Sequence, residues 1–98
     1  MDTQEFKTYV AEKKPFLLLD IREADELLTE AAIPGSTHLP MGKVFTSVAD
    51  GTLINDKPII VFCRSGKRAG IVAHELQALG FDAKALEGGL QALRADNN

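Results

Sequence analysis

The sequence has a single cysteine and two histidines, and this scarcity excludes several kinds of protein. One cysteine cannot form an internal disulfide, so the chain fits a reducing compartment and we expect a cytoplasmic location. One cysteine and two scattered histidines are too few for a metal-ligand cluster. The chain also lacks the GxGxxG and Walker motifs that bind nucleotides. We therefore expect no bound metal and no cofactor.

Acidic residues outnumber basic residues in this sequence. It also has no long apolar run. The 11 lysines and arginines against 14 acidic residues give a net charge of −3. Nucleic acids and membrane surfaces need a basic face, so we expect neither as a partner. No apolar run approaches the roughly 20 residues that span a bilayer, and the first residues lack a signal-peptide pattern. The 98 residues fit one domain, expected over residues 1–95, with a flexible tail at 96–98.

Two short apolar runs predict buried strands, at Phe16–Leu19 and at Ile59–Phe62. Both runs are continuous rather than alternating, which is typical of strands that are covered on both faces of a parallel sheet. Further short strands are expected at residues 36–39 and 83–86.

Apolar side chains at three- and four-residue intervals predict helices between these strands. The helices are expected near residues 3–14, 24–30, 41–48 and 67–79 and from residue 89 onward. Strands that alternate with helices indicate an α/β fold, with a parallel sheet and helices on both faces. Such folds bind ligands beyond the carboxyl ends of their strands, where Cys63 and Asp20 are expected to lie.

The segment CRSGKR, residues 63–68, places three cations directly behind the only thiol. A helix is expected to begin here, at Gly66 or Lys67. A helix N-terminus carries about half a positive charge, so basic side chains are locally unfavourable there. The three cations therefore indicate that the segment receives negative charge from elsewhere.

Two sources of that charge are consistent with the sequence. One is Cys63 as a thiolate, which cations and a helix N-terminus favour; the other is a bound oxyanion, held by backbone N–H groups and arginines. Gly66 permits the left-handed backbone that lets successive N–H groups converge. Together they predict a nucleophilic thiolate at the floor of an anion-binding cup. The alternative is a small buried Cys63 beside cations that are merely solvated.

Other polar residues carry weaker signals. Asp20 at a strand exit is either a general acid or, as we favour, a structural residue that pairs with a base or caps a loop. His74 is expected on the surface, and a structural role is favoured for His38.

Several segments together resemble rhodanese domains, and the match covers most of the chain. The segments are LLDIRE at 18–23, IPGS at 33–36, VFCRSGKRA at 61–69, LGF at 79–81 and LEGG at 86–89. Each is weak alone, but their order and spacing are specific. The resemblance implies the rhodanese-like α/β fold, with a sheet of four to five strands. A leading strand common in that family has no counterpart here.

The resemblance implies a thiosulfate sulfurtransferase without a cofactor. Cys63 would attack the outer sulfur of a small anionic donor such as thiosulfate and become a persulfide. Cyanide or a thiol, including one on a partner protein, would then remove that sulfur. Asp20 and Arg22 would support the loop. Five loop residues would hold the sulfur and the anionic remainder of the donor: Arg64, Ser65, Gly66, Lys67 and Arg68.

Two other functions remain open within the same fold. One is a sulfur carrier or regulatory binding module with little turnover of small molecules. The other is phosphate or arsenate chemistry, for which related enzymes use a Cys-x5-Arg loop. The loop from Cys63 to Arg68 is one residue shorter, which favours sulfur transfer.

Overall fold

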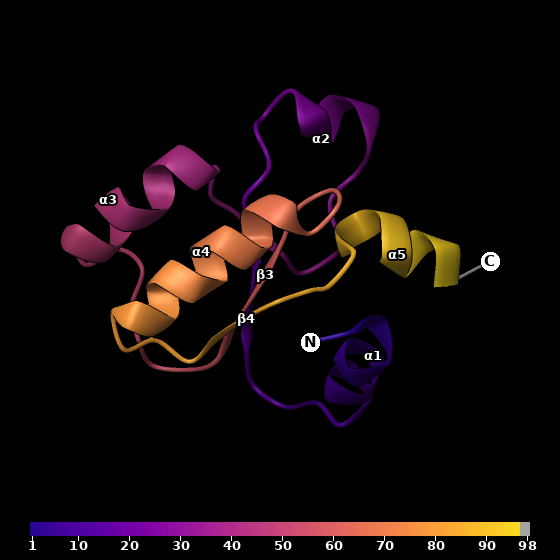
Figure 1. Ribbon diagram of the computed structural model, residues 1–98, viewed down its shortest axis with the longest axis horizontal. Helices are drawn as coiled ribbons and strands as arrows, with labels where there is room; N and C mark the ends of the chain where they lie inside the picture. The colour runs from indigo at the N-terminus through magenta and orange to yellow at the C-terminus, as the bar shows by residue number, and fades with distance from the viewer. Residues whose placement is uncertain (97–98) are drawn as a thin grey trace.

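A computed structural model describes residues 1–96, which form a central parallel sheet with helices on its two faces (Figure 1). The elements are α1 (Thr3–Ala11), β1 (Leu17–Asp20), α2 (Glu26–Thr29), β2 (Thr37–His38), a 3-10 turn (Met41–Lys43), α3 (Val44–Ala49), β3 (Ile59–Phe62), α4 (Lys67–Ala78), β4 (Ala83–Ala85) and α5 (Gly89–Asp96). No helix in the described part of the chain is long and apolar enough to cross a membrane.

The described residues form four strands in the order β2-β1-β3-β4, and every neighbouring pair is parallel. The predicted α/β fold is therefore confirmed. In the register, Asp20 at the end of β1 lies opposite Phe62 at the end of β3. The loops that follow both strands consequently leave the same edge of the sheet, as the sequence predicted for Asp20 and Cys63.

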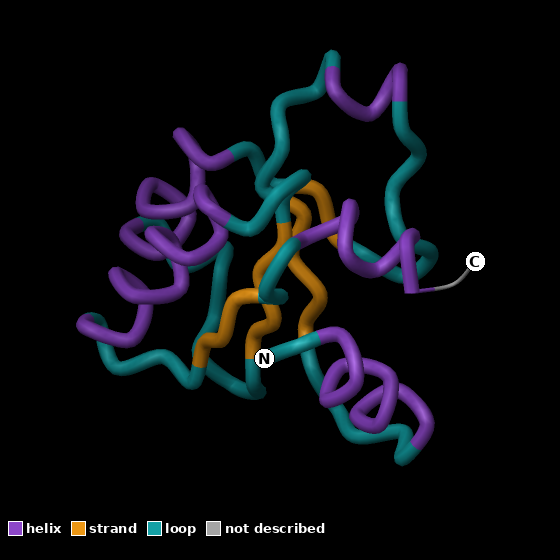
Figure 2. Tube along the Cα trace, turned by 45° about the vertical axis from the view of Figure 1, so that its right-hand side comes forward, coloured by secondary structure: helices purple, strands orange, loops and turns teal. Residues whose placement is uncertain are grey.

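Each apolar strand contributes side chains to two separate cores, one on each face of the sheet. Leu19, Val61 and Cys63 belong to the core beneath α3 and α4, whereas Leu18 and Ile60 belong to the core beneath α1 and α5. The tube view shows the strands between these two sets of helices (Figure 2). This arrangement explains why the apolar runs are continuous rather than alternating.

The ends of several elements differ from the sequence prediction. The expected helix over 41–48 begins as a 3-10 turn before α3, and β2 has only two residues. The side chain of Asp2 caps α1 by accepting the N–H of Glu5 at 2.8 Å. Asp96, expected in the tail, is the last residue of α5 and accepts hydrogen bonds from Gln4 and Lys7. Residues 97–98 of that tail lie outside the described residues.

Candidate active site

The only thiol lies directly after β3, at the start of the turn that leads into α4. Gly66 caps α4 with a left-handed backbone, φ +98°, and its N–H donates to the Sγ of Cys63 at 3.2 Å. A Cβ built on Gly66 would also lie 2.9 Å from the backbone nitrogen of Gly88. The helix therefore begins where the sequence predicted, and both the backbone angle and the close packing of residue 66 require glycine.

The thiol is more enclosed than an open cup would require. Cys63 has 0% relative exposure and packs with the core beneath α4. Arg64, Ser65 and Lys67 are exposed. Among the three basic residues of the loop, only Arg68 forms a salt bridge within the described residues. A donor molecule therefore reaches the sulfur only if the surrounding loops move.

Arg68 forms a two-pronged ion pair with Glu26, the first residue of α2. Its two terminal nitrogens donate to the two carboxylate oxygens of Glu26 at 2.7 and 2.8 Å. These hydrogen bonds from Arg68 are the main reason why the pKa of Glu26 falls to about 2. They also raise the pKa of Arg68, with a smaller contribution from the nearby Cys63. Arg68 thus interacts strongly with a carboxylate and more weakly with the thiol.

Asp20 and Arg22 form a buried pair, with 0% and 1% of their side chains exposed. Arg22 donates from Nε to both oxygens of Asp20, at 3.1 and 3.3 Å, and from Nη2 at 2.9 Å. The side-chain hydrogen bond to Asp20 is the main cause that raises the pKa of Arg22. Asp20 therefore pairs with a base, which is the structural role that the sequence favoured.

Arg22 also hydrogen-bonds the chain at the end of α2. Its Nη1 donates to the carbonyl of Glu30 at 2.9 Å. Within the described residues, Arg22 therefore stabilises the segment around α2. The resemblance had assigned that support to loop 63–68. His38, at the end of β2, hydrogen-bonds the carbonyl of Arg22 at 2.7 Å and so has a structural contact. His74 is exposed, as predicted.

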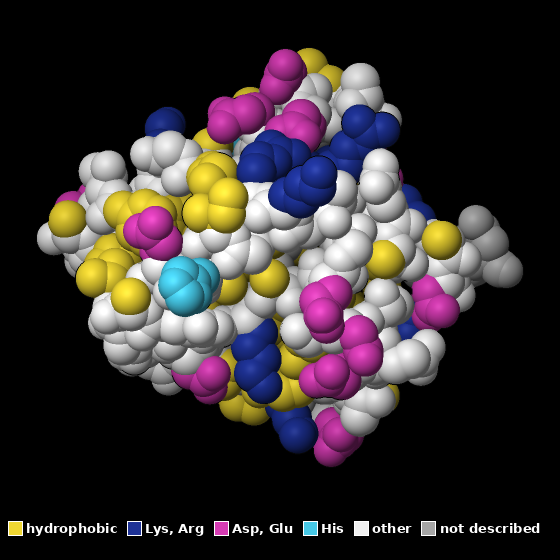
Figure 3. All heavy atoms as spheres, in the orientation of Figure 1, with side chains coloured by type: hydrophobic (Ala, Val, Ile, Leu, Met, Phe, Trp, Pro, Cys, Tyr) yellow, Lys and Arg dark blue, Asp and Glu magenta, His cyan; other side chains and the backbone are white. Residues whose placement is uncertain are grey.

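The segment around α2 forms one wall of the site and is held mainly by arginines. Besides Arg22 and Arg68, Arg94 of α5 binds the carboxylate of Glu30 at 2.7 Å. The residues of α2 itself are half-buried or exposed, and Leu28 is 87% exposed. A segment with so little apolar burial is expected to move more easily than the sheet. Figure 3 shows basic and acidic side chains adjoining over α2 and the start of α4.

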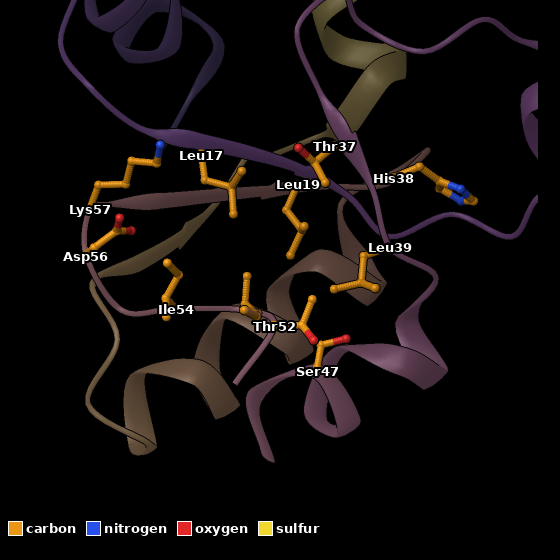
Figure 4. Close-up of a pocket in the computed structure, with 11 residues that line it drawn as sticks. Leu17, Leu19, Thr37, His38, Leu39, Ser47, Thr52, Ile54, Asp56 and Lys57 are labelled. Carbon is orange, nitrogen blue, oxygen red and sulfur yellow. The ribbon is translucent and has the colours of Figure 1, made fainter. Parts of the chain in front are cut away.

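Two cavities differ in their relation to the thiol. A cavity of about 250 Å³ lies beside the loop and is lined by Arg22, Glu26, Thr29, Glu30 and Arg64. Another, of about 370 Å³, lies near the edge strand β2 and the loop before β3 (Figure 4). The second cavity is lined mainly by aliphatic side chains and hydroxyl groups, and none of the predicted site residues lines it. We therefore place the candidate site at the first cavity.

The sequence was compared with those of known protein families. The family model for the rhodanese-like domain matches residues 2–96. The chain belongs to the rhodanese-like family. A rhodanese-like domain protein from Staphylococcus aureus has a similar structure, with a TM-score of 0.83 and 28% identity over 95% of this chain and 88% of that one.

Three curated proteins are also similar to this rhodanese-like chain. The putative sulfurtransferase YtwF of Bacillus subtilis is 34% identical over 94% of this chain and 86% of its own length. The putative sulfur carrier protein YrkF of the same organism is 33% identical over 78% of this chain. The tRNA sulfurtransferase of Desulfurococcus amylolyticus is 35% identical over 81% of this chain. The matches span 40% of YrkF and only 15% of the tRNA sulfurtransferase.

The thiol loop of this rhodanese-like domain rests on the start of α5. The N–H groups of Leu90 and Gln91 donate to the carbonyls of Cys63 and Arg64, both at 3.0 Å. Gly89 precedes them with φ +58°, and a Cβ built on it would overlap the carbonyl oxygen of Cys63 and lie 2.7 Å from that of Arg64. The sequence indicated Gly88 and Gly89 as the turn into the last helix and as part of the family resemblance, but not the contact between Gly89 and the thiol loop.

We expect Gly89→Ala to destabilise the domain and displace the thiol loop. The left-handed backbone costs a non-glycine residue about 1–3 kcal/mol, and the overlap with the Cys63 carbonyl adds to this. Urea unfolding and the alkylation rate of Cys63 measure the two effects. Gly80→Ala is the matched control, because Gly80 has φ +91° with nothing within 4 Å of an added Cβ. If both variants lost the same stability and Gly89→Ala left the alkylation rate unchanged, the predicted clash between the added Cβ and the Cys63 carbonyl would be wrong.

Proposed function

We propose that this rhodanese-like domain transfers sulfur, and that Cys63 carries the sulfur as a persulfide. The observation that carries the proposal is the position of the thiol. Its sulfur accepts the Gly66 N–H at 3.2 Å directly before α4, and Arg68 lies close to it. Backbone N–H groups at a helix N-terminus and a nearby guanidinium both stabilise an anionic sulfur. Family membership and the sulfurtransferase and sulfur-carrier names of its relatives support the same chemistry.

The proposed reaction has two steps with thiosulfate as the donor. The Cys63 thiolate attacks the outer sulfur of thiosulfate, the sulfur–sulfur bond breaks, and sulfite leaves with the electron pair. Cyanide or a thiolate then attacks the outer sulfur of the persulfide and takes it, which returns Cys63 as a thiolate. With cyanide the product is thiocyanate, so no external oxidant or reductant is needed.

The loop residues take distinct parts in this proposal. Gly66 supplies the N–H that faces the sulfur, and Arg68 supplies the positive charge beside it. Arg64 lines the adjoining cavity and would contact the anionic remainder of the donor. Ser65 and Lys67 are exposed at the rim, where they would guide anions rather than hold the sulfur. Asp20 and Arg22 act through the wall around α2.

A mass measurement tests the proposal. We expect thiosulfate to raise the mass of the protein by one sulfur atom, and cyanide to remove that atom and yield thiocyanate. The absence of a sulfur adduct with several sulfane-sulfur donors, together with a thiol that resists alkylation at pH 6, would overturn it.

A second function, that of a sulfur carrier for one protein partner, is favoured by the enclosure of the thiol. Cys63 has 0% exposure, and Arg68, the loop cation whose pKa its sulfur raises, is already paired with Glu26. Both features would slow small anions more than a partner that displaces the wall around α2. Slow loss of the persulfide to cyanide, but rapid loss to one protein thiol, would select this function.

A further inference from the structure

Glu26 is an acidic residue that is paired with Arg68, a cation of the thiol loop. Its carboxylate accepts two hydrogen bonds from Arg68, at 2.7 and 2.8 Å, and a third from the N–H of Glu23 at 2.7 Å. The side chain keeps only 28% of its exposure, so water screens it less than it would a surface carboxylate. Since the pKa of Glu26 is lowered to about 2 by Arg68 above all, this carboxylate is charged near neutral pH.

The ion pair neutralises the charge of Arg68, a cation of the thiol loop. Arg68 is close enough to Cys63 for the sulfur to raise its pKa, although Glu26 is the larger cause. An anion that approaches the sulfur therefore meets a guanidinium that is already paired, with a carboxylate on its other side. A donor with two negative charges is repelled by Glu26 about twice as strongly as a donor with one.

The rest of the cavity does not replace the lost positive charge. Its lining contains two arginines and two glutamates. Of these, Arg22 is paired with Asp20, and Glu30 is paired with Arg94. Arg64 enters none of the ion pairs found in residues 1–96, so it is the lining cation that remains to attract a donor. Arg64 attracts a dianion about twice as strongly as a monoanion, but the cost of removing an ion from water rises roughly with the square of its charge. With Glu26 cancelling the charge of Arg68, this one cation therefore compensates a donor with a single negative charge better than a donor with two.

We propose that Glu26 determines the charge preference of the site, which favours singly charged sulfur donors over doubly charged ones. The inference rests on the proposed function and narrows its substrate class from anionic donors in general to monoanionic ones. An alkanethiosulfonate has the required chemistry: it bears one charge, and the thiolate would take its outer sulfur while a sulfinate leaves with the electron pair. Thiosulfate would undergo the same step with an additional charge to accommodate.

Two donors with the same reacting sulfur test the preference. Methanethiosulfonate and thiosulfate both present a sulfur bound to an oxidised sulfur atom, but they carry one and two charges. We expect Glu26→Gln to raise the ratio of kcat/KM for thiosulfate to that for methanethiosulfonate by roughly three- to tenfold, the size expected for one partly exposed unit charge. Glu26→Asp retains the charge and should leave the ratio within about twofold of the wild type.

A neighbouring carboxylate provides the matched control. Asp25 is exposed and makes no side-chain capping hydrogen bond to α2. Asp25→Asn removes the same formal charge one residue away, so it should change the ratio by less than about twofold. If Asp25→Asn and Glu26→Gln raise the ratio equally, or if Glu26→Asp and Glu26→Gln change it alike, Glu26 does not act through its charge beside Arg68.

Alkylation of Cys63 separates failure of this inference from failure of the proposed function. Iodoacetate and iodoacetamide react with the same single cysteine, and iodoacetate carries one negative charge. The ratio of their rates cancels differences in loop opening and in thiol reactivity, because both reagents meet the same sulfur. We expect Glu26→Gln to raise the iodoacetate-to-iodoacetamide ratio by about threefold or more, whether or not sulfur is transferred. An unchanged ratio in both assays overturns the inference, whereas a raised alkylation ratio without sulfur transfer overturns only the proposed function.

Discussion

Cys63→Ser should reduce thiocyanate formation from thiosulfate and cyanide to the uncatalysed rate. The chain has one cysteine, so no second thiol can take over the sulfur. A serine hydroxyl at the same position is a far weaker nucleophile than a thiolate and cannot carry a persulfide. The mass of the variant should therefore stay unchanged after treatment with thiosulfate, and both half-reactions should be lost together.

The fold of this variant should survive the substitution. The serine oxygen can accept the Gly66 N–H that the sulfur accepts at 3.2 Å, but its hydroxyl replaces a thiol with 0% exposure, so the free energy of unfolding should fall by about 1–3 kcal/mol. Wild-type protein alkylated at Cys63 provides a chemical control and should be equally inactive. Thiocyanate formation at the wild-type rate by a folded Cys63→Ser variant would show that the thiol does not carry the sulfur.

The sequence predicts the sheet well because its signals are local. Continuous apolar runs mark β1 and β3, and Gly66 marks the start of α4 after the only thiol. The short elements are harder to predict. The pairing of β2 depends on its neighbour β1 in space, and its two residues are both exposed, so they carry no apolar pattern.

The ion pairs of the site could not be predicted in the same way. Glu26 and Arg68 are 42 positions apart, and nothing in the spacing of apolar residues joins them. The one available signal was compositional: the segment of residues 23–30 is rich in acidic side chains, and the chain elsewhere gathers three cations behind Cys63. Opposite charges indicate that such segments could meet, but not which carboxylate binds which cation. The complete burial of the thiol likewise depends on how the helices pack, because Cys63 joins the core beneath α4 and α5 hydrogen-bonds its carbonyl.

Asp20→Ala should lower the free energy of unfolding by about 3–5 kcal/mol, which is the cost of leaving one member of a buried ion pair without its partner. Arg22 is 1% exposed, and three of its side-chain hydrogen bonds go to Asp20. Without that carboxylate the guanidinium keeps its charge while almost entirely buried. A domain of this size has a total stability of about 5–15 kcal/mol, so the variant would be close to unfolding. Urea denaturation measures the loss.

Two further variants distinguish an unpaired buried charge from a general loss of packing. In Asp20→Ala/Arg22→Met the charge is removed as well, so this double variant should be more stable than Asp20→Ala alone. Lys7→Ala breaks the ion pair with Asp96, whose two side chains are both 37% exposed, and should cost at most about 1 kcal/mol. If the double variant were instead less stable than Asp20→Ala, the loss would come from the cavity that the smaller side chains leave. Arg22 would then hold the wall around α2 through its bulk and its bond to the Glu30 carbonyl rather than through its charge.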